Sequence, residues 1–238
     1  MLGSIHLTHF DKVLQRIRSG CEQCHIISIA HNSAGSFLRR HFSALVEDVD
    51  AFSLMTYDFS SFQNPGVGAD CLLQEGTGEA DDGGFLLKSF EWRLAAGAAT
   101  SSATCPGSDC VCVFAGPNSP LWWVRDCVEK LVPDASSPHR SKILLGLNLY
   151  GLDYSVTGGS HILGPQYIDI LATHKPKFSY DDVSKEHFFE YKTPTGRHVT
   201  FFPSLHSVAL RVQLANDLAT GVSLWEVGQG LDYFYDLL

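Results

Sequence analysis

The stretch AFSLMTYDF (residues 51–59) decides the fold class, because it is an apolar run that ends in polar and aromatic residues. A short apolar run with polar boundaries predicts a buried strand. Just before it, RRHFSALVEDV (residues 39–49) carries four apolar residues at helical spacing and predicts the end of a helix. A helix that leads into an apolar strand is typical of a repeating helix–strand pattern.

The same pattern continues toward the C-terminus. LWWVRDCVEKLV (residues 121–132) predicts an amphipathic helix, which Asn118-Ser119-Pro120 starts and Pro133 ends. KILLGLNLYG (residues 142–151) then predicts a second apolar strand.

A further helix and strand complete the pattern. SLHSVALRVQLANDLATG (residues 204–221) predicts a helix with Ser204 as its N-cap, and VSLWEVGQG (residues 222–230) predicts a third apolar strand. Between the second strand and this helix, HFFEYKTPTGRHVTFFP (residues 187–203) predicts a β-hairpin. Strands that are apolar throughout suit a parallel sheet covered on both faces, so the predicted class is α/β.

The N-terminal part of the chain fits this pattern poorly. HIISIA (residues 25–30) is shorter than the strand expected before residues 51–59, and polar residues follow it. We therefore expect residues 1–38 to form an atypical N-terminal segment, and the strand at residues 51–59 to have an unpaired edge.

Polar and aromatic residues follow each predicted strand at its carboxyl end: Tyr57-Asp58, Tyr150 and Trp225-Glu226. Ligands of α/β proteins bind where parallel strands end. Aromatic faces and carboxylates together suit a polyhydroxylated ligand, so the sequence predicts a saccharide cleft with Glu226 at its rim. The alternatives are that Tyr57 and Asp58 only cap a strand, and that Trp225 is a core residue.

Three motifs make the prediction more specific. SLMTYD, ILLGLNLYG and GVSLWEVGQGLDYFYDLL resemble the last three strands of glycoside hydrolase family 18, the chitinase barrels. The resemblance covers residues 39–66 and 117–238. It implies a partial TIM (β/α)8 barrel made of the last three βα units, with the β-hairpin as an insertion.

The resemblance also implies roles for individual residues. Met55, Tyr57 and Asp58 match the M-x-Y-D motif, whose Tyr and Asp contact the N-acetyl group of the substrate in related chitinases. Trp225 matches the tryptophan that floors the sugar subsite, and Tyr150 is a weaker match. The implied ligand is a chitooligosaccharide or a related N-acetylglucosamine glycan.

One family motif is not found in this sequence. Active members carry D-x-x-D-x-D-x-E, whose Glu protonates the leaving group while the substrate's acetamido oxygen attacks the anomeric carbon. The nearest candidate, EDVD (residues 47–50), has the wrong spacing and lies on the wrong element. The sequence therefore predicts binding without hydrolysis and no catalytic residue. The alternatives are a non-functional or regulatory truncated splice product and a fragment of an active chitinase.

Residues 67–116 carry no sustained pattern and exceed an ordinary connection in length. Joining Gly66 directly to Pro117 restores a compact strand-to-helix loop. We hypothesise that this stretch is a retained intron or a mispredicted exon, and a genuine loop insertion is the alternative.

Charge and composition exclude other classes of function. The net charge of −9 argues against nucleic-acid binding, and no apolar stretch approaches the length of a membrane span. The chain shows no signal peptide, although relatives in the family are secretory or lysosomal, so an extracellular or lysosomal location is an expectation from resemblance alone.

Seven cysteines, including the pair Cys21 and Cys24, lack metal-site spacing, and we predict no metal and no cofactor.

Overall fold

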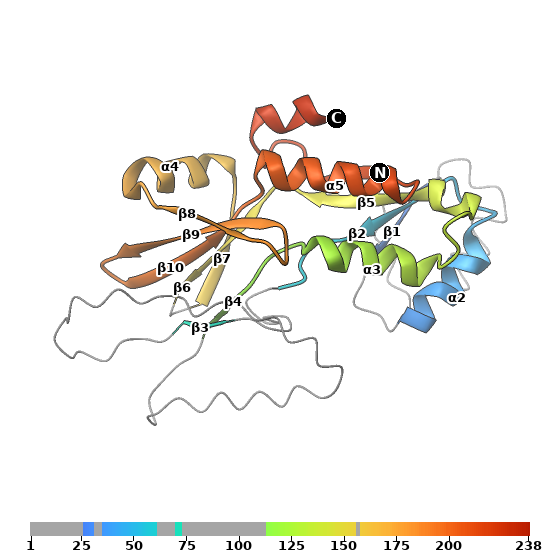
Figure 1. Cartoon of the computed structure of the whole chain (residues 1–238), viewed down its shortest axis with the longest axis horizontal. Coiled ribbons are helices and arrows are strands. Elements are labelled where there is room, and N and C mark those ends of the chain that lie inside the picture. The colour runs from blue at the N-terminus through green and yellow to red at the C-terminus, as the bar shows by residue number, and fades with distance from the viewer. Residues whose placement is uncertain (1–25, 31–34, 61–69, 73–112, 156–157) are drawn as a thin grey trace, which may run out of the picture.

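The computed structural model describes residues 26–30, 35–60, 70–72, 113–155 and 158–238. It has a parallel sheet flanked by helices and, beside it, an antiparallel sheet with a helix of its own (Figure 1). The parallel part consists of β1 (Ile26–Ala30), α2 (Gly35–Leu45), β2 (Ala51–Met55), α3 (Leu121–Leu131), η2 (Pro138–Lys142), β5 (Ile143–Asn148), α5 (Leu205–Asp217), β11 (Gly221–Trp225) and η3 (Asp232–Leu237).

The parallel sheet has the strand order β1-β2-β5-β11. All three neighbouring pairs are parallel, as the apolar strands predicted. The prediction that residues 25–30 are too short for a strand is wrong, because Ile26–Ala30 pairs residue for residue with Ala51–Met55. The expected unpaired edge on β2 is therefore wrong as well, since β2 lies between β1 and β5. The fold is of the α/β class. The described residues do not form a closed barrel.

Helices α2, α3 and α5 cover one face of this sheet and form a common core with it. The buried residues of this core include Phe42 of α2, Phe52 and Leu54 of β2, Val128 of α3, Leu145 of β5 and Leu214 of α5.

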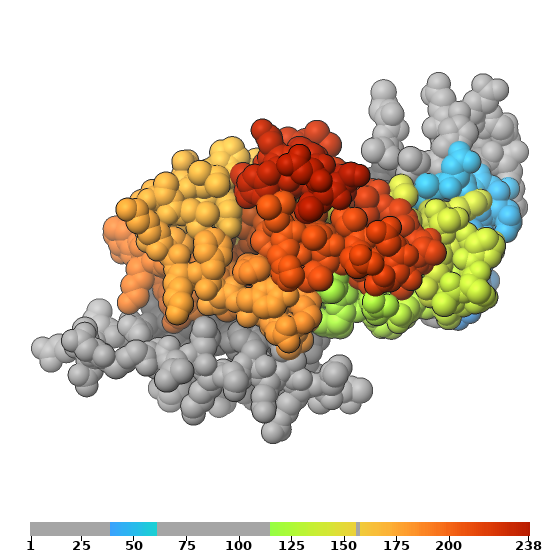
Figure 2. Space-filling model, turned by 45° about the horizontal axis from the view of Figure 1, so that its top comes forward, coloured from blue at the N-terminus to red at the C-terminus, as the bar shows by residue number. Residues whose placement is uncertain are grey.

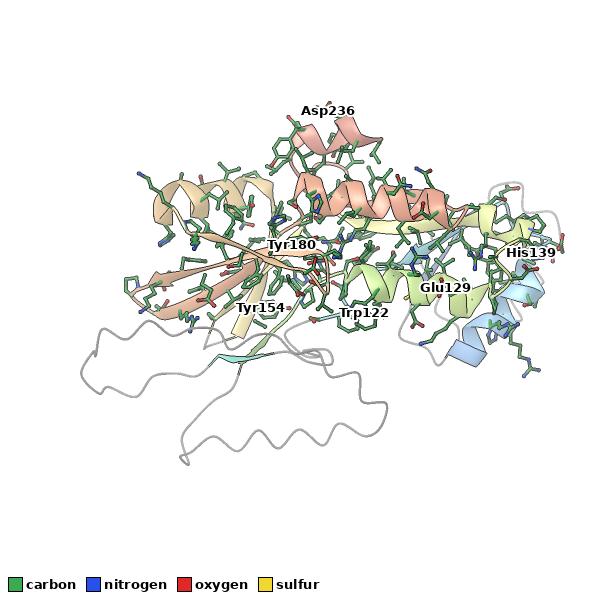
Figure 3. All side chains as sticks on the ribbon, viewed as in Figure 1. Trp122, Glu129, His139, Tyr154, Tyr180 and Asp236 are labelled. Carbon is green, nitrogen blue, oxygen red and sulfur yellow. The ribbon has the colours of Figure 1, made fainter. Side chains whose placement is uncertain are left out.

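Adjacent tryptophans show the amphipathic character of α3. Trp123 is buried in the core, whereas Trp122 is 40% exposed on the surface (Figure 3). α3 begins at Leu121, directly after the predicted start signal, with Pro120 as its N-cap and no side-chain capping hydrogen bond. By contrast, Ser204 caps α5 as predicted, since its Oγ accepts a hydrogen bond from the Ser207 N–H.

The predicted hairpin is part of a larger insertion between β5 and α5. The insertion consists of β6 (Gly151–Ser155), β7 (Gly158–Ile162), α4 (Gly164–His174), β8 (Phe178–Asp181), β9 (Glu186–Thr193) and β10 (Gly196–Phe201). Its strands pair in the order β7-β6-β10-β9-β8, all antiparallel. The apolar run at residues 142–151 predicts a single strand and misses β6, because β5 ends at Asn148 and β6 begins at Gly151 in the second sheet.

The insertion packs tightly against the C-terminal residues. The Gly164 N–H donates to the Gln229 carbonyl at 2.8 Å, and a Cβ on Gly164 would collide with the Gly230 carbonyl. Tyr167, Phe189 and Phe202 of the insertion share a core with Phe234. In the space-filling view, the orange insertion and the red C-terminal segment form a continuous surface (Figure 2).

Two short strands, β3 (Asp70–Leu72) and β4 (Val113–Ala115), pair with each other near the ends of the predicted low-pattern segment. Ala115 is buried against the insertion sheet, and the hydroxyl of Tyr154 (Figure 3) donates to the Gly116 carbonyl at 3.1 Å. Cys21 and Cys24 lie outside the described residues. Within the part of the chain that the structure describes, no helix has the length and apolar character needed to cross a bilayer.

Candidate functional site

The carboxyl ends of β2, β5 and β11 meet at one edge of the parallel sheet. Trp225, the last residue of β11, pairs with Asn148 at the end of β5, and the Leu149 N–H donates to the Trp225 carbonyl at 2.8 Å. Beyond β2, the Thr56 hydroxyl donates to the Gly146 carbonyl of β5 at 2.8 Å. These contacts bring the residues that follow the three strands to a shared rim.

Three aromatic side chains lie together at this rim. The Tyr57 ring lies 6.5 Å from the Trp225 ring at an interplanar angle of 29°, and 6.2 Å from the Tyr150 ring at 78°. Tyr150 is buried, whereas Trp225 is 50% exposed. Trp225 therefore offers an accessible apolar surface that packs on Tyr57, which in turn contacts Tyr150.

A carboxylate completes the group. The Tyr150 hydroxyl donates a hydrogen bond to Oδ1 of Asp58, an exposed residue. Burial, followed by the bond to Asp58, raises the pKa of Tyr150, and burial with the nearby Asp58 charge raises the pKa of Tyr57 to about 12. Both phenols are thus protonated donors at neutral pH. We call Tyr57, Asp58, Tyr150 and Trp225 the rim cluster.

The backbone of Asp58 has an unusual conformation that a second loop holds. Its φ is 62°, a region that costs most non-glycine residues free energy. Asn118 Oδ1 accepts from the Asp58 N–H at 2.6 Å, and the Asn118 carbonyl accepts from the Phe59 N–H at 2.9 Å. Sequence reasoning missed this function of Asn118, because N-S-P before an amphipathic run is also a helix-start signal.

Close packing of two strands places Tyr57. A Cβ on Gly146 would lie 2.6 Å from the Leu54 carbonyl oxygen and 2.8 Å from Cε1 of Tyr57. Glycine at this position therefore permits both the pairing of β2 with β5 and the observed position of the Tyr57 ring.

The other two predicted site residues lie apart from these contacts. Met55 ends β2 and is half-buried. Glu226 is exposed in the turn after β11, where its Oε1 accepts from Gln229 Nε2 at 3.2 Å. His161 of β7 was not predicted, yet its ring lies 5.3 Å from the Tyr150 ring. The roles of all these residues in ligand binding stay predictions.

The rim cluster combines an exposed indole face with hydroxyl and carboxylate groups. An indole face can stack on the C–H groups of a sugar ring, and the polar groups can bind hydroxyls or amides. This combination agrees with a carbohydrate ligand.

The family follows from a comparison of the whole chain. The profile of glycosyl hydrolases family 18 matches residues 6–230, so the chain belongs to this family. Its fold is that of the chitinases of this family.

Solved structures show the same fold. A chitinase from Chromobacterium violaceum matches with a TM-score of 0.63 at 19% identity, over 97% of this chain and 61% of that one. The Bacillus cereus spore cortex-lytic enzyme SleL matches with 0.65 at 16% identity, over 98% and 46%. The family 18 chitinase from Cycas revoluta in complex with (GlcNAc)3 matches with 0.56 at 13% identity, over 96% and 60%. The chain thus spans about half to three fifths of the length of these structures.

Proposed function

We propose that the chain binds an N-acetylated chitooligosaccharide or a related glycan at the rim cluster, without hydrolysing it. The observation that carries the proposal is the contact between Tyr150 and Asp58 beside the half-exposed Trp225. A family 18 chitinase binds (GlcNAc)3, which supports this class of ligand.

The expected lack of hydrolysis rests on the sequence. D-x-x-D-x-D-x-E, whose Glu is the general acid of active family members, is missing from the 238 residues. Within the family, the motifs around Asp58, Tyr150 and Trp225 favour the branch of chitinase domain-containing protein 1, a chitinase-like saccharide-binding protein. The same resemblance leads us to propose an extracellular or lysosomal location, which microscopy of the tagged chain in its native cells can test.

We also propose that residues 67–116 interrupt a loop that closes without them. Asp58 and Phe59, before this segment, bind directly to Asn118, after it. Sequencing the transcript across codons 60–125 tests whether the segment is an ordinary coding exon in the dominant message.

The binding proposal is tested by calorimetric titration of chitotriose into the purified chain. Trp225→Ala should weaken binding at least about tenfold, since a stacked tryptophan commonly contributes more than ~1.4 kcal/mol. Trp122→Ala is the matched control, because Trp122 is similarly exposed but lies on α3. It should leave the affinity unchanged.

Each remaining result favours an alternative. A wild-type chain that releases no heat with chitotriose supports a product without a ligand. Release of chromophore from an aryl chitobioside by the wild-type chain supports a fragment of an active chitinase. Equal losses in the two tryptophan variants would show that the rim cluster is not the binding site.

A further inference from the structure

A buried ion pair lies beneath the loop that holds Asp58. Glu186 of β9 and Arg211 of α5 are only 8% and 4% exposed, and Arg211 Nη2 lies 2.7 Å from Glu186 Oε1. Glu186 comes from the insertion, whereas Arg211 comes from a helix that covers the parallel sheet. The pair therefore joins the two parts of the molecule.

Both charges of the pair bind the main chain of Ser119. The Ser119 N–H donates to Glu186 Oε1 at 3.0 Å, and the Ser119 carbonyl accepts from the Arg211 guanidinium. Arg211 Nη1 also donates to the Ser207 carbonyl at 2.8 Å, which fixes the guanidinium to its own helix. The backbone N–H and the backbone carbonyl of Ser119 are thus both hydrogen-bonded to this ion pair.

Ser119 passes this constraint to the rim cluster. Its Oγ donates to the Thr56 carbonyl at 2.6 Å, and its neighbour Asn118 binds the amides of Asp58 and Phe59. Glu186 and Arg211 are therefore linked to the backbone of Asp58 through their hydrogen bonds to Ser119, the peptide bond from Ser119 to Asn118, and the hydrogen bond between Asn118 and Asp58.

We propose that Glu186 and Arg211 are positioning residues for the saccharide site, because their ion pair fixes Ser119 and Asn118 and thereby the conformation of Asp58. The ligand in this inference rests on the proposed function, whereas the positioning of Asp58 does not. Burial raises the pKa of Glu186 against the opposing effect of Arg211, as expected for a carboxylate with little access to solvent.

A double substitution can separate this positioning role from a general contribution of the ion pair to the free energy of unfolding. Replacing both members of a buried ion pair with apolar residues of similar volume is often neutral for stability, whereas removing one member leaves an unpaired charge. Glu186→Met/Arg211→Met should therefore stay folded. Its Ser119 N–H and carbonyl lose their partners, so Asn118 loses its fixed position.

The first measurement needs no saccharide. Amide hydrogen exchange by NMR should become at least tenfold faster at Asp58 and Phe59 in the double variant, while Leu145 in the buried β5 keeps wild-type protection. Should the double variant not fold, Glu186→Gln, which retains the side-chain volume, is measured by the same comparison of Asp58 with Leu145. Wild-type exchange at Asp58 and Phe59 in the folded variant overturns the inference.

The second measurement is the affinity for chitotriose, which should fall at least tenfold in the double variant. Asp153→Asn is the matched control, because Asp153 is also a buried carboxylate of the insertion sheet. It accepts hydrogen bonds from Tyr191 and Thr200 and contacts His198 at 2.8 Å, but no bond joins it to Ser119. It should keep wild-type affinity and wild-type exchange at Asp58.

The exchange measurement and the affinity measurement test different claims. A wild-type chain that does not bind chitotriose contradicts the proposed function, and the exchange rates still decide the positioning role. Loss of affinity in the Asp153 variant equal to that in the double variant contradicts a specific role for the ion pair.

Discussion

Replacing Gly146 with alanine should damage both the sheet and the rim cluster. The new Cβ would lie 2.6 Å from the Leu54 carbonyl oxygen, 2.8 Å from Cε1 of Tyr57 and 3.3 Å from the Thr56 nitrogen. Two of these three atoms belong to the backbone of β2 and its extension, which pairing with β5 holds in place. Relief of the overlap therefore requires that the strands separate or that Tyr57 moves.

The size of the effect follows from this crowding. Overpacking of a well-packed interior costs about 1–3 kcal/mol, and contacts with backbone place Gly146→Ala in the upper part of that range, at about 2–3 kcal/mol. For a chain of this size, the melting temperature should fall by roughly 4–12 °C. The free energy of unfolding is measured by urea denaturation, and chitotriose affinity is measured beside it.

Gly221→Ala is the matched control in the neighbouring strand β11. Its Cβ would also approach an atom at 2.6 Å, but that atom is Cδ2 of Leu144, the end of a flexible side chain. The cost should stay under about 1 kcal/mol, because the leucine can rotate away. A Gly146 variant as stable as the Gly221 variant would refute the reasoning that strand contact and Tyr57 require glycine there.

Three further predictions concern the rim cluster and the loop beside it. Tyr150→Phe removes the donor to Asp58 and should lower the free energy of unfolding by about 1 kcal/mol in urea, and weaken chitotriose binding; unchanged values of both would count against the Tyr150–Asp58 contact. The folded pKa of Tyr57, about 12, lies above the ordinary value of 10.0, so its stabilising effect is complete below pH 10 and is lost as the pH rises toward 12. Tyr57→Phe should therefore reduce the fall in melting temperature over that range, and an equally steep fall would contradict the assigned burial. Deletion of residues 67–116 should leave a monomer whose affinity for chitotriose is within about threefold of wild type. The free energy of unfolding should fall by ~1–3 kcal/mol, because the Tyr154 hydroxyl loses the Gly116 carbonyl as its acceptor. An aggregate would indicate a structural role for the segment.

The elements predicted from sequence are those whose pattern is local. The helix at Leu121–Leu131 and the strand at Ala51–Met55 have strong apolar patterns, and both lie where the pattern placed them. Ser204 likewise caps α5 because a capping interaction spans only a few residues. The meeting of Tyr57, Asp58, Tyr150 and Trp225 was also foreseeable, since parallel strands end at a common edge.

The elements that the sequence did not reveal depend on distant partners. β1 is a five-residue strand whose stability comes from pairing with β2, and no local signal distinguishes it from a short apolar loop. β6 follows β5 after two residues, so the two strands look like one apolar run. The contact between Asn118 and Asp58 joins residues 60 positions apart, and nothing in the helix-start motif indicates it.

Resonances of the four tryptophan indoles test the central claim most directly. Chitotriose is titrated into the ¹⁵N-labelled chain, and each indole N–H is assigned with a single tryptophan-to-phenylalanine variant. Saccharide binding at the rim cluster predicts that the Trp225 indole and the Asp58 amide shift together in a saturable manner, while Trp122 and Trp123 stay in place. Shifts confined to Trp122, or a saturating titration that leaves Trp225 and Asp58 unmoved, would contradict the account.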